Sequence, residues 1–285
     1  MHKPKPADVE LLGATLGFHP LTLEDTVHFG QRPKFEDYGD FAFLVVYGHA
    51  PDADGLVEVH CYYSARFLVT VRRDEAPSLE ELRRELAERG ELFGDGVLVL
   101  YRVVDALVDG FFALLARFDD RLELIEEAMI SSPSEAQLQD VFKMRRRLVT
   151  LRRTIMPQRD LFGRLAGGVA GLPGMTPEAE HYFRDVHDHL IRLADQLDGQ
   201  RELMTGAIDL YLSTSSNRLN TTIKQLTVVA TIFLPLSFIT GFFGQNFGWL
   251  VDNVGGWGAF VGLGLGLELG AVFALLGFFK RKGWF

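Results

Sequence analysis

Residues 241–249 read Gly-Phe-Phe-Gly-Gln-Asn-Phe-Gly-Trp, a polar, glycine-rich turn between two apolar segments near the end of the chain. The first segment, Leu226 to Phe243, has no charged residue, and the second, Trp257 to Phe279, has only Glu268. Each is long enough to cross a hydrocarbon core of roughly 30 Å at about 1.5 Å per residue. The pattern predicts a membrane hairpin with spans at about 226–244 and 257–279, joined by a loop at 245–256.

Charged residues at the ends of the hairpin predict its orientation. Arg218 and Lys224 precede the first span, Lys280, Arg281 and Lys282 follow the second, and the turn has no Lys or Arg. The positive-inside rule therefore places both chain ends in the cytosol and the turn outside the cytoplasmic membrane. The alternative is a buried helical hairpin of a soluble protein, which the segment lengths and basic flanks disfavour.

Composition excludes several function classes. The 285-residue chain has a net charge of −9, and an acidic chain is poorly suited to bind nucleic acid. A single cysteine, Cys61, rules out an intrachain disulfide and a CxxC zinc site. The sequence has no phosphate-binding loop, nucleophile elbow or dinucleotide fingerprint, so we do not expect an enzyme.

The residues before the hairpin predict an α+β protein with two further parts. Residues 1–95 resemble a mixed α/β cytosolic domain, with strands at Phe41–Tyr47, Leu56–Tyr63 and Phe67–Arg72. Ser78 and Glu81 have the spacing of a helix capping box. Residues 96–220 have a helical period throughout and predict a helical hairpin followed by a long stalk helix, with the membrane hairpin at 221–285.

Three long helices are expected in this helical part. One runs from Val97 to Ile130, a second is capped by Ser134 and ends near Leu165, and a third runs without a break from Glu178 to Phe243. The third helix has an apolar seam that Gln200 interrupts, and its length implies a stalk shared with partner chains. The seam comprises Leu190, Leu193, Leu197, Met204 and Tyr211.

An uncharged stripe follows the end of the third helix into the first membrane segment. Small, apolar and neutral polar residues recur there at near-heptad spacing, and small residues allow helices to approach closely in a membrane. If several copies surround an axis, this stripe lines a pore, with Ile223 and Leu234 as apolar gates. The candidate pore-lining residues are Asn220, Ile223, Leu226, Thr227, Ala230, Leu234, Ser237 and Gly241.

Several short motifs in this region resemble the CorA family of magnesium channels, which belongs to the superfamily named for Gly-Met-Asn. They are Ser-Asn-Arg-x-Asn at 216–220, Lys-x-Leu-Thr at 224–227, Ile-Phe-x-Pro-Leu at 232–236 and Gly-x-Asn at 244–246. The resemblance is close over residues 97–285 and loose before them. It implies a funnel-shaped homopentamer in which the first membrane helix lines the pore and the second surrounds it.

The resemblance also implies a function. Gly244, Gln245 and Asn246 would form the selectivity filter of a divalent cation channel, where a neutral amide ring binds hydrated Mg²⁺ through its waters. Gln245 departs from the family's Met and puts the selectivity in doubt. We therefore keep open a transporter of Zn²⁺, Co²⁺, Ni²⁺ or several divalent cations, with or without proton coupling, and a non-conducting membrane-anchored sensor.

Acidic residues of the stalk are the candidates for regulation by intracellular Mg²⁺. The resemblance implies that Asp185 holds a regulatory ion between protomers, with Asp74 or Glu75 as the partner acid. His181, Asp185 and His189 have zinc-ligand spacing on one helix face. Four acids of the stalk recur at intervals of seven residues: Asp188, Asp195, Glu202 and Asp209. They form either a solvated helix face or part of the regulatory site.

Glu268 lies within the second membrane segment, where a charge is costly. Three interpretations are open. The side chain has a partner within the bundle, it is protonated and faces lipid, or it serves as a proton or cation site.

Overall fold

The computed structural model describes residues 1–50, 55–89 and 96–284. The chain divides into two compact units, Met1–Leu210 and Tyr211–Phe285, and one helix, α6 (Pro177–Phe243), belongs to both. The domain boundary expected at residue 95 lies outside the described residues.

The first unit contains a four-stranded antiparallel sheet in the order β1-β2-β3-β4. The strands are β1 (Lys34–Asp37), β2 (Ala42–His49), β3 (Leu56–Tyr63) and β4 (Leu68–Arg72). β2 and β3 are buried along most of their length, as their β-branched and aromatic residues predict. The Ser64 side chain accepts from the N–H groups of Arg66 and Phe67 and closes the short turn before β4.

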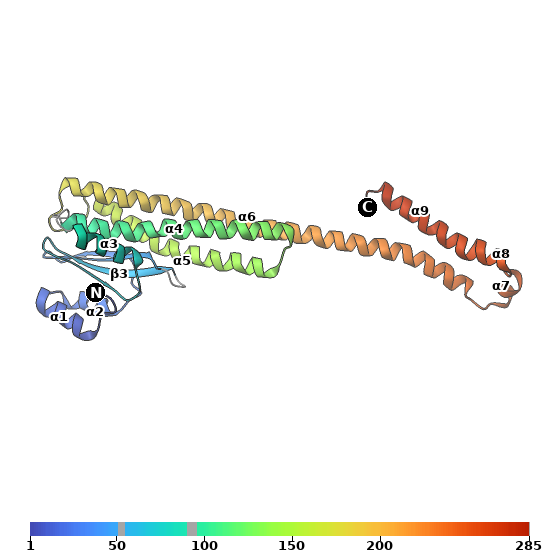
Figure 1. The fold of residues 1–285 in the computed structure, drawn as a ribbon, viewed down its shortest axis with the longest axis horizontal. Coiled ribbons are helices and arrows are strands. Elements are labelled where there is room, and N and C mark those ends of the chain that lie inside the picture. Colours follow the sequence, from blue (N-terminus) through green and yellow to red (C-terminus); the bar gives the residue numbers. More distant parts are fainter. Residues whose placement is uncertain (51–54, 90–95, 285) are drawn as a thin grey trace. The chain divides into compact units, whose positions relative to one another are not determined.

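Helices cover both faces of this sheet (Figure 1). On one face, α1 (Pro6–Leu16) and α2 (Pro20–Val27) enclose an aromatic core that includes Phe18, Phe43 and Tyr62. On the other face, β2 approaches α4 so closely that a Cβ at Gly48 would lie 2.5 Å from a methyl group of Leu107. The same Cβ would lie 3.1 Å from the Cα of Leu107, so a larger residue at position 48 would require the backbone of α4 to shift. The sequence did not predict α1, α2 or β1.

The helix α3 (Pro77–Arg89) begins earlier than its capping box predicted. Ala76 O accepts from the N–H groups of Leu79 and Glu80, so the helix starts at Pro77 and Ser78 already lies inside it. The prediction of a cap at Ser78 was wrong because proline, which lacks an N–H and has a helical φ, is favoured at the first position.

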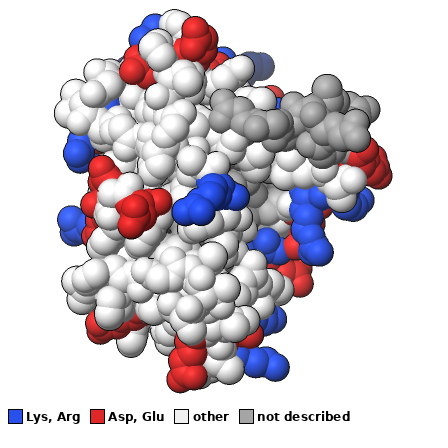
Figure 2. Space-filling view, turned by 90° about the vertical axis from the view of Figure 1, so that its left-hand side faces the viewer, with Lys and Arg blue, Asp and Glu red and all other residues white. Residues whose placement is uncertain are grey.

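The helices α4 (Gly96–Ser131) and α5 (Glu135–Ala166) confirm the predicted helical hairpin. Ser134 and Gln137 form a reciprocal capping box at the start of α5. Pro157 lies within α5, and the next residue, Gln158, accepts from the Tyr47 N–H at 2.7 Å, which joins α5 to β2. On the face in Figure 2, acidic and basic side chains are interspersed.

The part of α6 in the first unit buries its apolar seam within its own chain. Leu190, Leu193, Leu197 and Met204 are all buried there. Gln200 does not interrupt the seam, because its side chain is buried and donates to Leu115 O at 2.8 Å and to Asp119 at 3.0 Å on α4. The polar residue is accommodated because α4 offers acceptors for both of its N–H groups.

The second unit is a helical hairpin. The end of α6 is followed by α7 (Gly248–Asn253) in the expected loop, then by α8 (Trp257–Ala259), a π-helix, η2 (Phe260–Gly266), and α9 (Leu267–Arg281). The predicted second span is thus helical, but a π-helical segment lies within it. The apolar windows of the two spans are only 6% and 0% buried, so they do not form the core of a soluble protein within this chain.

Candidate ion pathway and metal site

The turn that ends α6 leaves Gly244, Gln245 and Asn246 exposed. The N–H of Gly244 donates to Thr240 O at 2.9 Å, and the N–H of Gln245 donates to Phe242 O at 3.3 Å, which closes the last helical turn. Phe247 O then accepts from the N–H groups of Leu250 and Val251 in α7. Asn246 therefore lies between two helix ends, where its side chain is exposed.

All eight candidate pore-lining residues are exposed on α6, from Asn220 to Gly241. Ile223 and Leu234 are eleven residues apart and face nearly the same way, at about 100° per residue. Val228 lies five residues after Ile223, and Ile239 lies five residues after Leu234. Each therefore points roughly 140° away from the stripe around the helix axis. Val228 is buried and Ile239 is half-buried. The stripe therefore lies away from the sheltered face of α6.

The sheltered face of α6 is the one that meets the returning helix. Lys224 Nζ donates to Gly283 O at 3.2 Å and lies 5.5 Å from the centre of the Trp284 ring. Trp284 stacks on Phe279 with ring centres 5.3 Å apart. These contacts attach the end of α9 to α6 at one end of the hairpin, and leave the stripe uncovered in the single chain.

Glu268 has a partner at the other end of the hairpin. Thr240 Oγ1 lies 2.6 Å from Glu268 Oε1, and Glu268 is the second residue of α9, directly after the π-helix. The structure thus supports the first of the three interpretations, a partner within the bundle. A π-helix has i→i+5 hydrogen bonds, so it changes the direction in which the following side chains point compared with a continuous α-helix. The π-helix ends at Gly266, two residues before Glu268, whose side chain contacts α6.

A second cluster of ligand-type residues lies in the first unit, where α4 meets α6. The ligand atoms of Asp105, Asp185 and His189 all lie within 4.8 Å of one another. His189 Nε2 is 3.7 Å from Asp185 Oδ1, and His189 Nδ1 is 3.6 Å from Asp105 Oδ1. Asp109 lies 3.2 Å from the same Nδ1. The Tyr101 hydroxyl donates to Asp185 at 3.1 Å and orients it.

Burial and repulsion act on Asp105 within this cluster. Burial raises the pKa of the Asp105 carboxyl, and the neighbouring charge of Asp109 raises it further. Among the described residues, Asp105 Oδ1 is buried without a hydrogen bond, while the Arg102 guanidinium lies 3.9 Å from the other oxygen, Oδ2. A cation bound at Oδ1 would stabilise the ionised carboxylate further. Carboxylates suit Mg²⁺, and the imidazole of His189 suits Zn²⁺, Co²⁺ or Ni²⁺, so the residues fit a divalent metal ion.

The structure brings together only some of the predicted metal residues. Asp185 and His189 meet, but His181 is exposed and Asp105 of α4 completes the described group instead. Two residues eight apart on a helix diverge by roughly 80°, so His181 turns away. Asp74 lies beside Arg73 at 3.6 Å, and Glu75 is exposed. Asp188, Asp195, Glu202 and Asp209 all lie on the exposed face of α6.

Sequence reasoning missed Asp105 and Asp109. The signal that could have found them is an acid among apolar neighbours, since Asp105 lies between the buried pairs Val103-Val104 and Leu107-Val108. An acid at a core position of an amphipathic helix needs a partner or a ligand.

Comparison with known proteins agrees with this geometry. Residues 1–281 match the family described as CorA-like Mg²⁺ transporter protein. The chain is 32% identical to the cobalt/magnesium transport protein CorA of Thermotoga maritima, over 97% of this chain and 79% of that protein. It is 26% identical to the zinc transport protein ZntB of Yersinia enterocolitica, over 80% and 69%.

A solved structure has the same fold. The complete structure of the CorA magnesium transporter from Methanocaldococcus jannaschii superposes with a TM-score of 0.86, over 100% of this chain and 90% of that chain, at 23% identity.

Proposed function

The chain belongs to the CorA-like Mg²⁺ transporter family, and from this premise we propose that it is a homopentameric channel that carries Mg²⁺ across the cytoplasmic membrane into the cytosol. The family transports divalent metal ions and its members are not enzymes. The choice of Mg²⁺, the pentamer, the inward direction and the regulation belong to this proposal.

One observation carries the proposal. The stripe from Asn220 to Gly241 is exposed, lies away from the face of α6 that meets α9, and leads to the exposed Asn246. A helix that keeps a stripe of small, apolar and neutral polar residues uncovered, while the second membrane helix contacts it on another side, is suited to surround an axis with further copies of itself. In such a ring, Ile223 and Leu234 would form apolar constrictions.

The proposed filter consists of Gly244, Gln245 and Asn246. Mg²⁺ releases its water reluctantly, so an amide ring that hydrogen-bonds to the water shell selects the ion without stripping it. A neutral ring also allows release, because it does not hold the ion by charge. Gln245 adds a second amide beside Asn246, where the magnesium members of the family have Met.

The proposed regulation depends on Asp185 and its neighbours. Asp105, Asp109 and Asp185 place three carboxylates around His189. A bound cytosolic Mg²⁺ would offset their repulsion and favour a closed ring, and its loss would allow the ring to open. The same proposal includes a ligand from the next protomer, either Asp74 or Glu75.

The experiment is Mg²⁺ uptake into liposomes that contain the purified chain. Asn246→Ala should abolish uptake, because it removes the amide from the proposed filter, whereas Asn253→Ala in the same loop should not. Asn253 is the matched control, since its side chain donates to Trp249 O within α7. Equal uptake by the two variants would contradict the proposal, and a wild-type chain with no uptake would favour the non-conducting sensor.

A second candidate is a Zn²⁺ or broad divalent cation transporter of the same architecture. The observation that favours it is the imidazole of His189 among the carboxylates, since nitrogen ligands suit Zn²⁺ better than Mg²⁺. Uptake of Mg²⁺, Co²⁺, Ni²⁺ and Zn²⁺ in the same liposomes, with and without a pH gradient, distinguishes the candidates. Uptake of Zn²⁺ but not Mg²⁺ would replace the first proposal with the second.

A further inference from the structure

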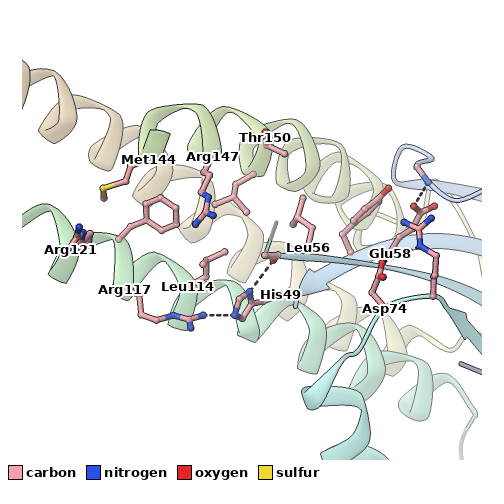
Figure 3. A pocket seen from close by; sticks show the side chains of 16 residues that line it. His49, Leu56, Glu58, Asp74, Leu114, Arg117, Arg121, Met144, Arg147 and Thr150 are labelled. Atoms are coloured by element: carbon pink, nitrogen blue, oxygen red, sulfur yellow. Dashed lines mark hydrogen bonds and ion pairs between the residues drawn. The ribbon is translucent and has the colours of Figure 1, made fainter. Parts of the chain in front are cut away.

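A cavity of about 670 Å³ lies between the sheet and the helices α4 and α5 in the first unit (Figure 3). Three arginines of its wall already interact within the chain. Arg117 points to His49 and donates to its Nε2, and Arg121 lies 3.1 Å from Asp140. Arg147 has a partner as well. The basic residues of the second unit differ, because they have no acidic partner.

The basic residues of the second unit all belong to the end of the hairpin where α9 ends. They are Arg218, Lys224, Lys280, Arg281 and Lys282. The two acids of this unit lie elsewhere, since Asp252 is in the loop at the opposite end and Glu268 contacts Thr240 there. Lys280 follows Glu268 by twelve residues, which is roughly 18 Å of helix. In the part of the chain that the structure describes, none of the five basic residues forms an ion pair.

The end of α9 is closed by its own backbone. Gly283 has a φ of +67°, and its N–H donates to Lys280 O at 3.1 Å. The N–H of Trp284 donates to Phe279 O at 3.0 Å. This Schellman motif satisfies the last carbonyl groups, so the basic side chains are not needed to cap the helix. The helix dipole is equivalent to only about half a charge at this end, which is far less than three cations.

Lys224 reaches the same place from α6. Its ammonium group donates to Gly283 O at 3.2 Å and lies 5.5 Å from the centre of the Trp284 ring. A carbonyl group and an aromatic ring hold the ammonium group without neutralising it, so its positive charge remains. The side chains that follow on α9 are exposed. We call this group the basic end: Lys224, Lys280, Arg281, Lys282 and Trp284.

An apolar surface of α9 adjoins the basic end. Phe273 and Phe278 are 70% and 55% exposed, so the single chain leaves them open to contact. A tryptophan at the edge of an apolar span is typical of the membrane–water interface, where the ring is apolar and its N–H meets water. A ligand at this place would therefore meet cations with one part and an apolar surface with the other. Phospholipids with a negatively charged headgroup have this division.

We propose that the basic end binds the headgroups of anionic phospholipids. The phosphate groups lie against the basic side chains, and the acyl chains lie along the surface of α9 that contains Phe273 and Phe278. Clusters of basic residues beside a membrane span attract anionic lipids in this way. A zwitterionic lipid also has a phosphate group, but its own ammonium group offsets the attraction. The proposal requires the hairpin to lie in a membrane, and it holds whether or not the chain conducts ions.

The test is quenching of Trp284 fluorescence by brominated lipids in vesicles that contain the full chain. The reporter variant carries Trp249→Phe and Trp257→Phe, which leaves Trp284 as its one tryptophan. The vesicles contain equal amounts of phosphatidylglycerol and phosphatidylcholine, and only one of the two lipids has brominated acyl chains. Quenching should show at least about a fivefold preference for phosphatidylglycerol, the effect of one basic residue at an anionic surface. Equal quenching by the two lipids overturns the proposal.

A second reporter examines the opposite end of the hairpin. Trp257 is 78% exposed at the start of the second span and has no basic neighbour in sequence. The variant that keeps it carries Trp249→Phe and Trp284→Phe. The two brominated lipids should quench Trp257 equally. The same preference at Trp257 and Trp284 would show that the anionic lipid does not select the basic end, and the assignment would fail.

The matched variants are made one at a time in the Trp284 reporter: Lys280→Gln, Arg281→Gln, Lys282→Gln and, as the control, Arg146→Gln. Each of the first three should lower the preference about twofold to fivefold, since salt screens part of the contribution of each cation. Arg146 is an exposed cation of the first unit, and its variant should keep the preference of the reporter. Thermal melting checks that each variant folds. Equal losses in all four variants would show that net charge alone sets the preference, which contradicts the proposal.

Discussion

Thr240 Oγ1 lies 2.6 Å from Glu268 Oε1 and 2.9 Å from Leu236 O, so one hydroxyl connects the last turns of α6 to the first turn of α9. A hydroxyl has a single hydrogen to donate. In one arrangement, Thr240 donates to Leu236 O and a protonated Glu268 donates to Thr240. In the other, Thr240 donates to an ionised Glu268. Both arrangements hold the two helices together just before the Gly244–Asn246 turn.

We predict that Glu268→Gln keeps transport at the wild-type level. The amide N–H₂ of Gln can donate to Thr240 Oγ1 and reproduce the first arrangement without a titratable proton. Glu268→Leu removes the interhelical bond and should cost about 1 kcal/mol of stability. Ion uptake with and without a pH gradient, together with thermal melting of each variant, measures both effects. A pH-gradient response that disappears in Glu268→Gln would instead assign a proton-coupling role to Glu268.

We predict that Asn246→Asp changes the rate and the affinity in opposite directions. A ring of carboxylates would bind Mg²⁺ directly and release it slowly, so maximal uptake should fall while half-maximal uptake occurs at a lower Mg²⁺ concentration. Uptake as a function of Mg²⁺ concentration gives both values. A variant with an unchanged rate and affinity would show that the side chain of residue 246 does not contact the ion.

The sequence predicted the features that depend on local pattern. The two apolar helices long enough to cross a membrane, the uninterrupted α6 and the Ser134 cap all follow from residue order within one element, and the structure contains them. Such signals are strong because each is contained in a few neighbouring residues.

Features that depend on contacts distant in sequence were not predictable. Asp105 joins Asp185 only because α4 packs against α6, and α1 is a helix whose two buried residues, Val9 and Leu12, are too few to produce a clear period. The π-helix at Phe260–Gly266 was also not predicted. Its alternating glycines weaken the helical pattern, and an apolar sequence does not distinguish a π-helix from an α-helix.

We predict that Glu58→Gln destabilises the first unit in a pH-dependent way. Burial alone would raise the pKa of Glu58, but bonds from His60 and the N–H groups of Gly30 and Gln31 outweigh it and lower the pKa below 4.5. A carboxylate with a lowered pKa stabilises the fold above its unfolded pKa, and that stability is lost as the pH falls through the folded value. Gln places an N–H₂ group against these donors, so the cost at pH 7 should be about 1–3 kcal/mol.

Thermal melting of the full chain between pH 3 and pH 7 measures this difference. The gap between the wild type and Glu58→Gln should be full near pH 7 and should narrow as the pH falls below about 4.5, because the wild-type carboxylate becomes protonated. Glu81→Gln is the control, since Glu81 is an exposed carboxylate on α3. A gap that stays constant over this range would show that the charge of Glu58 contributes nothing and that only its shape matters.

We predict that His189 determines which metal ions the Asp105–Asp185 cluster prefers. His189→Gln replaces the imidazole with an amide and leaves the carboxylates in place. The affinity for Zn²⁺, Co²⁺ and Ni²⁺ should therefore fall about tenfold, while the affinity for Mg²⁺ changes little. Asp105→Asn removes a carboxylate and should weaken all four ions. The increase in melting temperature with metal concentration, measured in the full chain, gives these affinities, because a ligand that binds only the folded state stabilises it.

His181→Gln, on the same helix but outside the cluster, is the matched control and should behave as the wild type. If His181→Gln lowers the Zn²⁺ response and His189→Gln does not, the ligand set is the sequence-based trio around His181 and the contact between α4 and α6 is not a metal site.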